Sequence, residues 1–574
     1  MQTSEYLAPL ARSDARALVR SGWVVAAGLT VGALTMFLIY FVVLNQATPT
    51  WWPDAYEYAV VARNVAQGRG LTVTAHYVLD TYLLRQFSLP LPYVHHDIGL
   101  PLLMAAVLAL LGANNTAVAW TGGIFYILII PLTFLFGWKL YNKYVGLFAA
   151  LLALINVQLV GFSTTGLSEV PFAFFITLFW FALYRQKTRL DILISGALFG
   201  WLWVLRSNVL SALPFVLLFL IIAPPTANGS FVSARRPLSD LWTARRAILT
   251  RIGLFLIGSL LVLSPTFWRN YATLGNPLYN VSSKYSLVFY TNVFEGKNKD
   301  FVSLAGIDVE PVQYILTHPD QLWSKMNYQL AQTFDDLWRG GLLPEPTLVD
   351  AIEIVLLLLT VIIPRPNETT RQRLFRWTIY LCIASALLVG SMTHLRWRHL
   401  YGFLPIVLIF ISEFLLRVTD LTRNRLQFRI NPLFGIALFT IVLAIPSWYA
   451  ILQTVHTGQP LDDEYRQMAS LVRETSPDNA LVLIRRGDAS IGMQNALAWY
   501  ADREVAEFDD FTIQYFQAQR GTRPLYVLFV SNKPRPPNNN NLSRVGLLNY
   551  KQIAERPSTL DLNAYLYAPP SASP

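Results

Sequence analysis

Apolar runs recur along almost the whole of this chain of 574 residues. Several of them reach the roughly 17–25 residues that a membrane-spanning helix needs. Only 14% of the residues are charged, whereas a soluble domain carries about a quarter. The pattern therefore predicts a mainly α, polytopic membrane protein whose principal partner is the lipid bilayer.

Basic residues in the gaps between the apolar runs orient the chain. The net charge is +10, but the basic residues cluster between apolar runs, so the positive-inside rule explains them better than nucleic-acid binding does. Arg12, Arg16 and Arg20 precede the first run, which predicts a cytoplasmic N-terminus. That run has no small-residue cleavage site, so we expect it to remain as an anchor.

The apolar run at 98–112 decides how the chain is threaded, because its length of about 15 residues is marginal for a crossing. If it crossed, the next basic clusters would face outward. If it lies along the outer surface, every basic cluster faces the cytoplasm, namely 139–143, 185–189, 235–251, 365–376 and 417–429. We therefore predict a surface helix here.

This threading predicts about eleven membrane spans, and an odd number places the C-terminus outside. The predicted spans are 22–44, 116–138, 145–163, 168–184, 190–205, 208–223, 252–270, 350–364, 377–392, 400–417 and 433–452. One long broken helix over 190–223 would invert everything after it, and the basic clusters argue against that alternative.

Two regions follow from this division. Residues 1–452 form a transmembrane domain with two outer loops, 46–115 with juxtamembrane helices and 271–349. Residues 453–574 alternate amphipathic helical and apolar strand patterns, which predicts a small extracytoplasmic α/β domain.

The first outer loop opens with a short amphipathic helix that carries an acid at its start. In the stretch WWPDAYEYAVVARN, Pro53 begins the helix and Asp54 lies close to its positive end. Two interpretations of Asp54 stand side by side, a plain N-terminal cap and a catalytic carboxylate. The helix also carries Glu57 and Arg63.

Further polar residues lie at predicted outer ends of spans. His95, His96 and Asp97 adjoin the surface helix, and we expect polar packing or substrate contact more than metal ligation there. Glu169 begins a span and is either a cap or a functional acid.

Four arginines lie outside against the positive-inside trend, Arg206, Arg269, Arg396 and Arg398. A phosphate or pyrophosphate on a lipid would account for them, since guanidinium pairs well with phosphate oxygens. Snorkelling to ordinary headgroups is the alternative. The single cysteine, Cys382, excludes a disulfide within the chain and is expected to be a buried apolar residue.

The order of these motifs resembles the GT-C superfamily of integral-membrane glycosyltransferases, in particular the dolichyl-phosphate-mannose protein mannosyltransferases and the lipid A aminoarabinose transferases. The stretches that carry the resemblance are WWPDAYEYAVVARNVAQGRG, HHDIGLPLL (similar to HPPGYPLL), GLSEVPF, the stretch around Arg206, SPTFWRNYATLGNPL and RWRHLYGFLPIVLIF. They span residues 22–415. Asp97 and Ile98 stand where the family has two prolines, and the second acid, Glu57, comes three residues after the first.

The resemblance implies transfer of a sugar from a polyprenyl-phosphate-linked donor to a lipid, glycan or protein acceptor on the outer face, usually with inversion. It implies that Asp54 is the general base that deprotonates the acceptor. The expected substrate-binding residues are Glu57, Arg63, His95, His96, Asp97, Glu169, Arg206, Arg269, Arg396 and Arg398. Because the metal-ligand set is weak, a reaction without cofactor is favoured over one that uses a divalent metal.

Three other functions remain open from sequence. The first is an oligosaccharide polymerase or ligase that uses a pyrophosphate-linked glycan. The second is a lipid or sugar transporter, which would place charge near the bilayer midplane. The third is a sensory or scaffold protein that works through its tail. The expected location is the plasma membrane, with the endoplasmic reticulum as the alternative.

Overall fold

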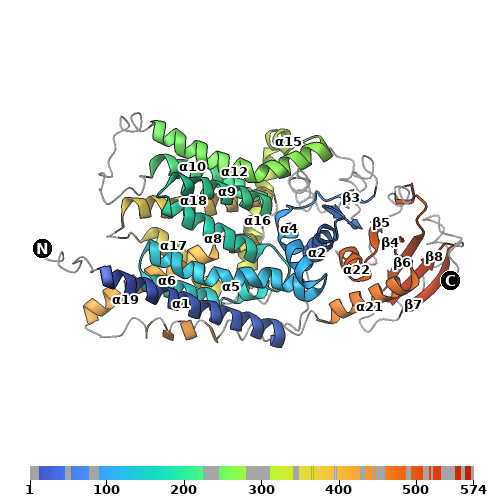
Figure 1. Ribbon diagram of the computed structural model, residues 1–574, viewed down its shortest axis with the longest axis horizontal. Helices are drawn as coiled ribbons and strands as arrows, with labels where there is room; N and C mark the ends of the chain where they lie inside the picture. Colours follow the sequence, from blue (N-terminus) through green and yellow to red (C-terminus); the bar gives the residue numbers. More distant parts are fainter. Residues whose placement is uncertain are drawn as a thin grey trace.

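The computed structural model describes most of the chain. The described residues are 12–44, 53–76, 89–223, 245–278, 311–339, 348–363, 368–393, 397–426, 459–485, 493–508, 516–518, 521–531, 550–556 and 563–569, with a few isolated positions between them. Figure 1 shows a long helical bundle that contains α1 at one side and leads into an α/β domain that contains the C-terminal strands.

The bundle follows the predicted apolar runs. Its elements are α1 (Arg12–Leu38) with the π-helix η1 (Ile39–Leu44), α5 (Asn115–Leu140), α6 (Lys143–Ile155), α7 (Val157–Phe162), α8 (Glu169–Arg185), α9 (Arg189–Leu205), η3 (Ser207–Ala212), α10 (Leu213–Ile222), α12 (Arg245–Leu274), α17 (Leu348–Ile362), α18 (Thr370–Met392), η4 (Trp397–Phe403) and α19 (Leu404–Leu426). Helices α15 (Pro311–Thr317) and α16 (Pro319–Arg339) belong to the second predicted outer loop.

Polar side chains set the helix boundaries inside otherwise apolar sequence. Asn114 accepts a hydrogen bond from the Ala117 amide at the start of α5, and Thr188 forms a capping box with Asp191 at the start of α9. Asn156 ends α6 and caps α7, so the predicted single span over 145–163 is broken into two helices. Each of these side chains satisfies amides that the first turn of a helix leaves unpaired.

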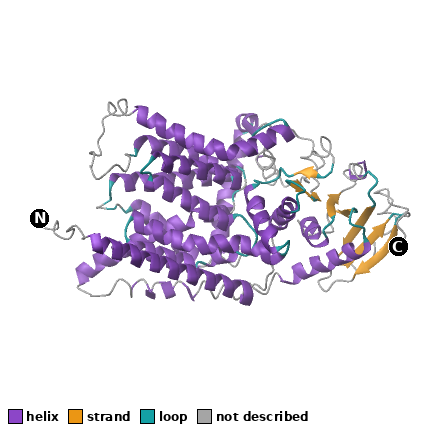
Figure 2. Ribbon diagram, in the orientation of Figure 1, coloured by secondary structure: helices purple, strands orange, loops and turns teal. Residues whose placement is uncertain are grey.

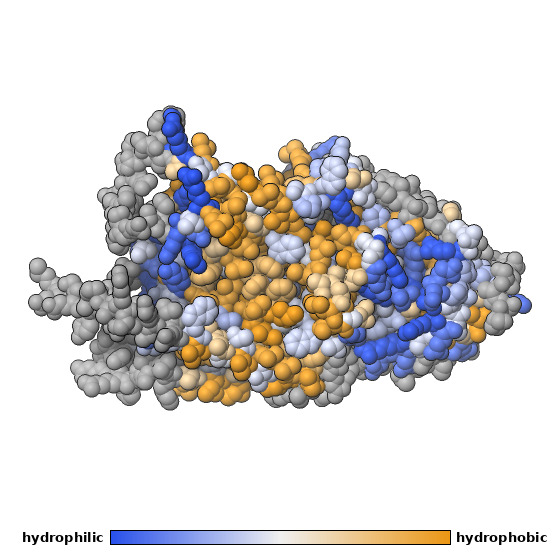
Figure 3. Space-filling view, in the orientation of Figure 1, coloured by the Kyte–Doolittle hydropathy of each residue, from blue (hydrophilic) through white to orange (hydrophobic). Residues whose placement is uncertain are grey.

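Among the described residues, five helices are long and apolar enough to cross a membrane, Ser21–Val42, Asn115–Leu140, Arg245–Leu274, Thr370–Met392 and Arg398–Thr419. The other bundle helices are shorter, and the predicted span at 433–452 lies largely outside the described residues. Figure 3 shows an apolar surface over the middle of the molecule with hydrophilic residues toward both of its ends. The chain therefore has the surface of a membrane protein, and the count of eleven spans stays a prediction.

The basic clusters expected at the cytoplasmic side lie together at one end of the bundle. Arg371, at the start of α18, donates to the Tyr184 carbonyl at the end of α8. Arg251 of α12 donates to Gln186 after α8, at 3.0 Å, and to the Ala223 carbonyl after α10, at 2.9 Å. These contacts join helix ends that are far apart in sequence, as the predicted threading requires.

The C-terminal region is an α/β domain around a six-stranded sheet of order β2-β5-β4-β6-β8-β7. Figure 2 shows its strands gathered at the end of the molecule away from α1. Its elements are α21 (Gln459–Thr475), β4 (Leu481–Arg485), α22 (Met493–Ala501), β5 (Glu504–Phe508), β6 (Leu525–Ser531), β7 (Lys551–Arg556) and β8 (Asn563–Ala568). Strands β2, β5, β4 and β6 run parallel, and β8 and β7 add antiparallel pairs.

The sheet is not built from the tail alone. Strand β2 (Ala75–His76), in the first outer loop, pairs in parallel with β5, and the Val505 amide donates to the Thr74 carbonyl at 2.8 Å. The same loop contains a two-stranded ribbon of β1 (Thr72–Val73) and β3 (Leu91–Pro92). The first outer loop is thus shared between the bundle and the α/β domain.

Helices α2 (Pro53–Ala66) and α4 (Gly99–Leu111) lie where the bundle meets this domain (Figure 1). They pack against each other, and α2 also packs against α22. Helix α4 covers the predicted surface run at 98–112. Its last residues Leu110 and Leu111 are 84% and 52% exposed, as expected for an apolar helix in contact with lipid.

Candidate active site

Four elements bring charged side chains together at the end of the bundle nearest the α/β domain. Asp54 comes from the first turn of α2, Glu169 from the first turn of α8, Arg206 from the residue after α9 and Arg398 from η4. Because each residue lies at a helix end, the helix boundaries themselves place them at the same level of the bundle.

The four side chains form a continuous chain of ion pairs. Arg398 donates to Asp54 across 2.9 Å, and its Nε lies 3.9 Å from Glu169. Arg206 donates to the same Glu169 oxygen across 2.7 Å and to the Ser168 hydroxyl across 2.9 Å. Two arginines thus share one buried glutamate, and one of them also holds Asp54.

Exposure separates the three acids of this region. The side chain of Asp54 is 29% exposed, whereas those of Glu57 and Glu169 are 0% and 2% exposed. Glu169 can act only as a fixed counter-charge, because nothing in solvent reaches it. Asp54 is the acid that an incoming molecule can touch.

Glu57 and the two histidines form a second layer next to these ion pairs. The Glu57 carboxylate lies 3.6 Å from His95 and 3.8 Å from His96, and His96 also packs edge-on against Tyr58. Within the described part of the chain, no three His, Cys, Asp or Glu side chains are arranged as metal ligands. Metal independence stays a prediction.

Asp97 and Gly99 fasten the backbone that carries Arg206. The Asp97 carboxylate accepts a hydrogen bond from the Ser207 amide at 2.8 Å. Burial raises the pKa of Asp97, and this hydrogen bond offsets part of the rise. A Cβ on Gly99 would lie 2.7 Å from the Val204 carbonyl oxygen. The HHDIG stretch therefore acts on the site through the position of Arg206.

Three predicted site residues are not placed in this cluster. Arg63 points into the α/β domain, where it donates to the Trp499 and Ala498 carbonyls and pairs with Asp502 at 3.0 Å. Arg269 donates to the Tyr93 carbonyl, next to the loop that carries His95. Arg396 lies outside the described residues.

The position of Arg63 follows from helix geometry. Successive residues of an α-helix are rotated by about 100°, so residues nine apart lie on opposite faces. Arg63 is therefore opposite Asp54, and the sequence contained this signal. Burial lowers the pKa of Arg63 to about 10, and the carbonyl bonds and Asp502 compensate the buried guanidinium.

A second set of contacts fixes the helix that carries Asp54, and sequence alone did not reveal it. Asn495 of α22 donates to the Pro53 carbonyl at 3.0 Å. Tyr56 and Tyr500 both donate to Asp462 of α21, the latter at 2.6 Å. Tyr56 is separated from Asp462 by 406 residues, so no local pattern predicts the pair.

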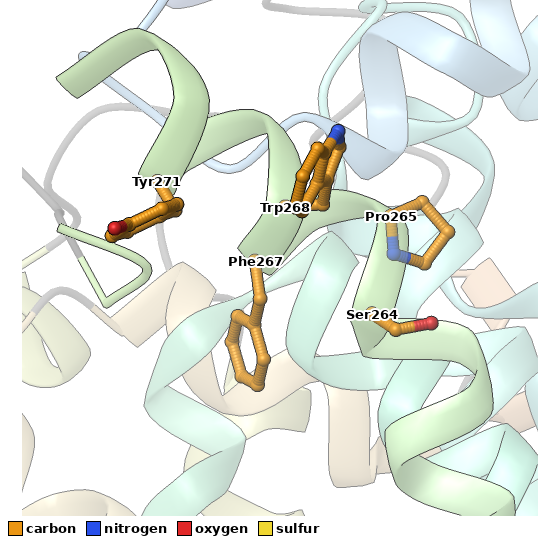
Figure 4. Close-up of a pocket in the computed structure, with 5 residues that line it drawn as sticks. All are labelled: Ser264, Pro265, Phe267, Trp268 and Tyr271. Carbon is orange, nitrogen blue, oxygen red and sulfur yellow. The ribbon is translucent and has the colours of Figure 1, made fainter. Parts of the chain in front are cut away.

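An apolar hollow lies on α12, near the predicted outer end of that span. Figure 4 shows the five side chains that line it, Ser264, Pro265, Phe267, Trp268 and Tyr271, which form an open space of about 580 Å³. Trp268 and Tyr271 are 72% and 59% exposed. Exposed aromatic residues are typical of the membrane–water boundary.

Known proteins match this chain through structure and not through sequence. No family model matches it, and no curated protein does. Among solved structures, ArnT from Cupriavidus metallidurans bound to undecaprenyl phosphate is similar at 12% identity and a TM-score of 0.50, over 96% of this chain and 99% of that one. The archaeal oligosaccharyltransferase AglB from Archaeoglobus fulgidus, in complex with an inhibitory peptide and a dolichol-phosphate, is similar at 12% identity and a TM-score of 0.50, over 88% of this chain and 69% of that one.

The Archaeoglobus fulgidus oligosaccharyltransferase in complex with Zn and sulfate gives a TM-score of 0.52 at 13% identity, over 88% of this chain and 68% of that one. These likenesses show that the chain shares the fold of these membrane transferases, as the sequence motifs predicted. At such low identity they define the fold, and the activity has to be argued from the site.

Proposed function

We propose that this protein transfers a sugar from a polyprenyl-phosphate-linked donor to an acceptor on the extracytoplasmic side of the plasma membrane, with Asp54 as general base. The observation that carries the proposal is the pairing of the solvent-accessible Asp54 with Arg398 at the end of the bundle. The similar structures are bound to undecaprenyl phosphate and to a dolichol-phosphate, which supports a donor of this class.

The arrangement suits the chemistry of glycosyl transfer to a hydroxyl. A general base has to reach the acceptor proton, and Asp54 is the accessible acid. The leaving group is a phosphate, whose developing negative charge is stabilised by fixed cations. Arg398 and Arg206 are partly exposed, at 17% and 13% of their side chains, so a lipid phosphate can contact both.

Donor binding also explains how a carboxylate paired with arginine becomes a base. An arginine at 2.9 Å stabilises the ionised form of Asp54 and so weakens it as a base. A phosphate that draws Arg398 toward itself relieves that pairing. Asp54 then gains basicity only when the donor is present. Attack of the acceptor from the face opposite the phosphate inverts the anomeric centre.

The likeness to oligosaccharyltransferases keeps transfer of a whole oligosaccharide from a lipid carrier as the second candidate. Both candidates use the same arginines, so the site does not distinguish them. They are distinguished by which lipid-linked donor the protein accepts.

The test is sugar transfer by purified protein in proteoliposomes. A panel of radiolabelled polyprenyl-phosphate sugars, with one pyrophosphate-linked oligosaccharide, is supplied to wild type, Asp54→Asn and the control Asp463→Asn. Asp463 is an exposed acid of α21 outside the site. We expect release of free polyprenyl phosphate by wild type and the control, and a loss of about 10²–10⁴-fold in Asp54→Asn. Equal turnover of all three proteins would contradict the role of Asp54.

A further inference from the structure

A polar cleft of about 680 Å³ lies between the end of α2 and the α/β domain. Parts of the chain that are far apart in sequence line it: the end of α2 with the stretch after it, the turn after α4, the end of α21 with the stretch before β4, the end of α22 with β5, and the residues before β6. Five arginines are among the lining residues, Arg63, Arg69, Arg473, Arg503 and Arg523.

The cleft carries more positive than negative charge, with five arginines against three acids. Arg523 pairs with Glu504, whose side chain is 9% exposed, and Arg63 pairs with Asp502. Arg503 lies 2.9 Å from Asp478, but the Asp478 side chain is 99% exposed. An ion pair with so exposed a partner is weak, and Arg503 is held mainly by its hydrogen bonds to Ser476 and to the Arg473 carbonyl.

Two arginines have no strong partner of their own. Arg69 is half exposed and lies 3.7 Å from the Asp502 that Arg63 already holds. Arg473 is exposed, and within the described part of the chain no acid lies in ion-pair range of it. Arginine forks of this kind bind the oxygens of phosphates and carboxylates in pairs.

The lining also holds buried polar atoms with unused hydrogen-bonding capacity. Among the described residues, Thr74 Oγ1 and Arg63 Nε are buried and have no hydrogen-bond partner. The whole Arg63 residue is only 4% exposed. Buried polar atoms are nearly always satisfied by protein, water or ligand. Gln67 and Asn479 add exposed amides at the cleft, and such amides suit sugar hydroxyls.

We propose that this cleft binds an anionic carbohydrate, a sugar chain that carries a phosphate or a carboxylate. We take that carbohydrate to be part of the acceptor of the sugar transfer, and this identification rests on the proposed function. Arg63 follows Asp54 by nine residues on one helix, which at 1.5 Å per residue is roughly 13 Å along its axis. Because Arg63 and Asp54 lie on opposite faces of that helix, the acceptor has to be long enough to pass around α2 when its anionic group lies in the cleft and a hydroxyl reaches Asp54.

Binding is tested separately from transfer by isothermal calorimetry on the full chain in detergent. The probes are trigalacturonate, the neutral maltotriose and inorganic phosphate. The variants are Arg69→Glu/Arg473→Glu, the matched control Lys551→Glu, an exposed basic residue on β7 outside the cleft, and Asp54→Asn. We expect trigalacturonate to bind at least tenfold more tightly than maltotriose or phosphate, to weaken at least tenfold in the double variant and to bind unchanged to the other two.

Each alternative result overturns a defined part of the proposal. Equal binding of trigalacturonate and maltotriose would remove the role of charge, and equal binding of inorganic phosphate would remove the role of the carbohydrate. Absence of binding, or unchanged binding to the double variant, would remove the site itself. If binding to Asp54→Asn persists while no donor is turned over by wild type, the cleft stands and the proposed transfer reaction fails.

Discussion

Arg398 lies between two acids from different helices, 2.9 Å from Asp54 and 3.9 Å from Glu169. Arg206 holds Glu169 from its other side at 2.7 Å. The candidate base is therefore the outermost member of a chain of alternating charges whose innermost acid is buried. In the proposed function, a lipid phosphate that binds Arg398 would weaken the pairing of Arg398 with Asp54.

The first prediction concerns Arg398. Replacement by glutamine removes the cation that contacts both the accessible base and the expected phosphate, so we expect transfer to fall by at least 10²-fold. Arg398→Lys keeps the charge but not the fork that reaches two acids, and should recover only part of the activity. Proteoliposome transfer rates measure both variants, with melting temperature as the control for folding. Full activity of Arg398→Gln would contradict the proposed phosphate contact.

The second prediction concerns the buried pair of Arg206 and Glu169. Arg206→Met leaves the buried Glu169 with only Arg398, 3.9 Å away, as its counter-charge, so the free energy of unfolding should fall by up to about 3–5 kcal/mol. The double variant Arg206→Met/Glu169→Gln removes both charges and should regain most of that stability while transfer stays low. Thermal unfolding in detergent separates the two effects. A double variant whose destabilisation equals the sum of those of Arg206→Met and Glu169→Gln would show that the pair is not energetically coupled.

The third prediction concerns Gly99, whose Cα packs against the backbone before Arg206. An added Cβ would lie 2.8 Å from the Leu205 amide nitrogen, so Gly99→Ala has to displace that backbone. A shift of about 1 Å at a reacting group can cost on the order of 10²-fold in rate, and we expect a loss of this size in transfer. Gly253→Ala is the matched control, because nothing lies within 4 Å of its added Cβ. Equal activity of both variants would show that the contact does not position Arg206.

The fourth prediction concerns the hydrogen bond by which the α/β domain holds α2, the helix that carries Asp54. Asn495→Ala removes the hydrogen bond to the Pro53 carbonyl, and we expect kcat to fall about tenfold, the equivalent of about 1.4 kcal/mol, with little change in KM. Gln494→Ala is the control. Gln494 is a buried amide on the same helix, and its Nε2 has no hydrogen-bond partner among the described residues. Equal kcat values for the two variants would reduce Asn495 to a packing residue.

The positions of the helices along the chain, and the end of the bundle at which each helix end lies, could be predicted from sequence. Apolar run lengths and the basic clusters located the helix ends, because both signals come from the bilayer itself. The contacts of Arg371 and Arg251 at one end of the bundle, and of Arg206 and Arg398 at the other, agree with that threading.

The pairings between distant elements could not be predicted in this way. Arg398 and Asp54 are 344 residues apart, and only packing decides which arginine meets which acid. Strand β2 has two residues, too few for a period-2 pattern, so its place in the sheet depends on its partner β5. The break at Asn156 interrupts an apolar run that reads as one span.

The last prediction concerns pH and the edge of the sheet where the first outer loop joins the α/β domain. His76 lies 2.7 Å from Glu504, and Arg523 pairs with the same carboxylate. Burial on its own raises the pKa of Glu504, but the bonds from His76 and Arg523 outweigh it, so the pKa is lower than in the unfolded chain. The carboxylate therefore contributes stability that is fully present above the ordinary glutamate pKa of about 4.3, and this stability is lost as the pH falls through the lower pKa of the folded state.

Hydrogen exchange of the Val505 amide reports this contribution, because that amide bonds to the Thr74 carbonyl across the junction. After correction for intrinsic exchange rates, we expect protection to fall as the pH is lowered from about 5 toward 3. Glu504→Gln should be less protected at pH 5 and should lose little more on acidification, because no proton is taken up at that position. The Tyr565 amide in β8, on the far side of the sheet, serves as the reference. A parallel loss of protection at Val505 and Tyr565 would mean that acid opens the whole domain, and that Glu504 does not control the junction.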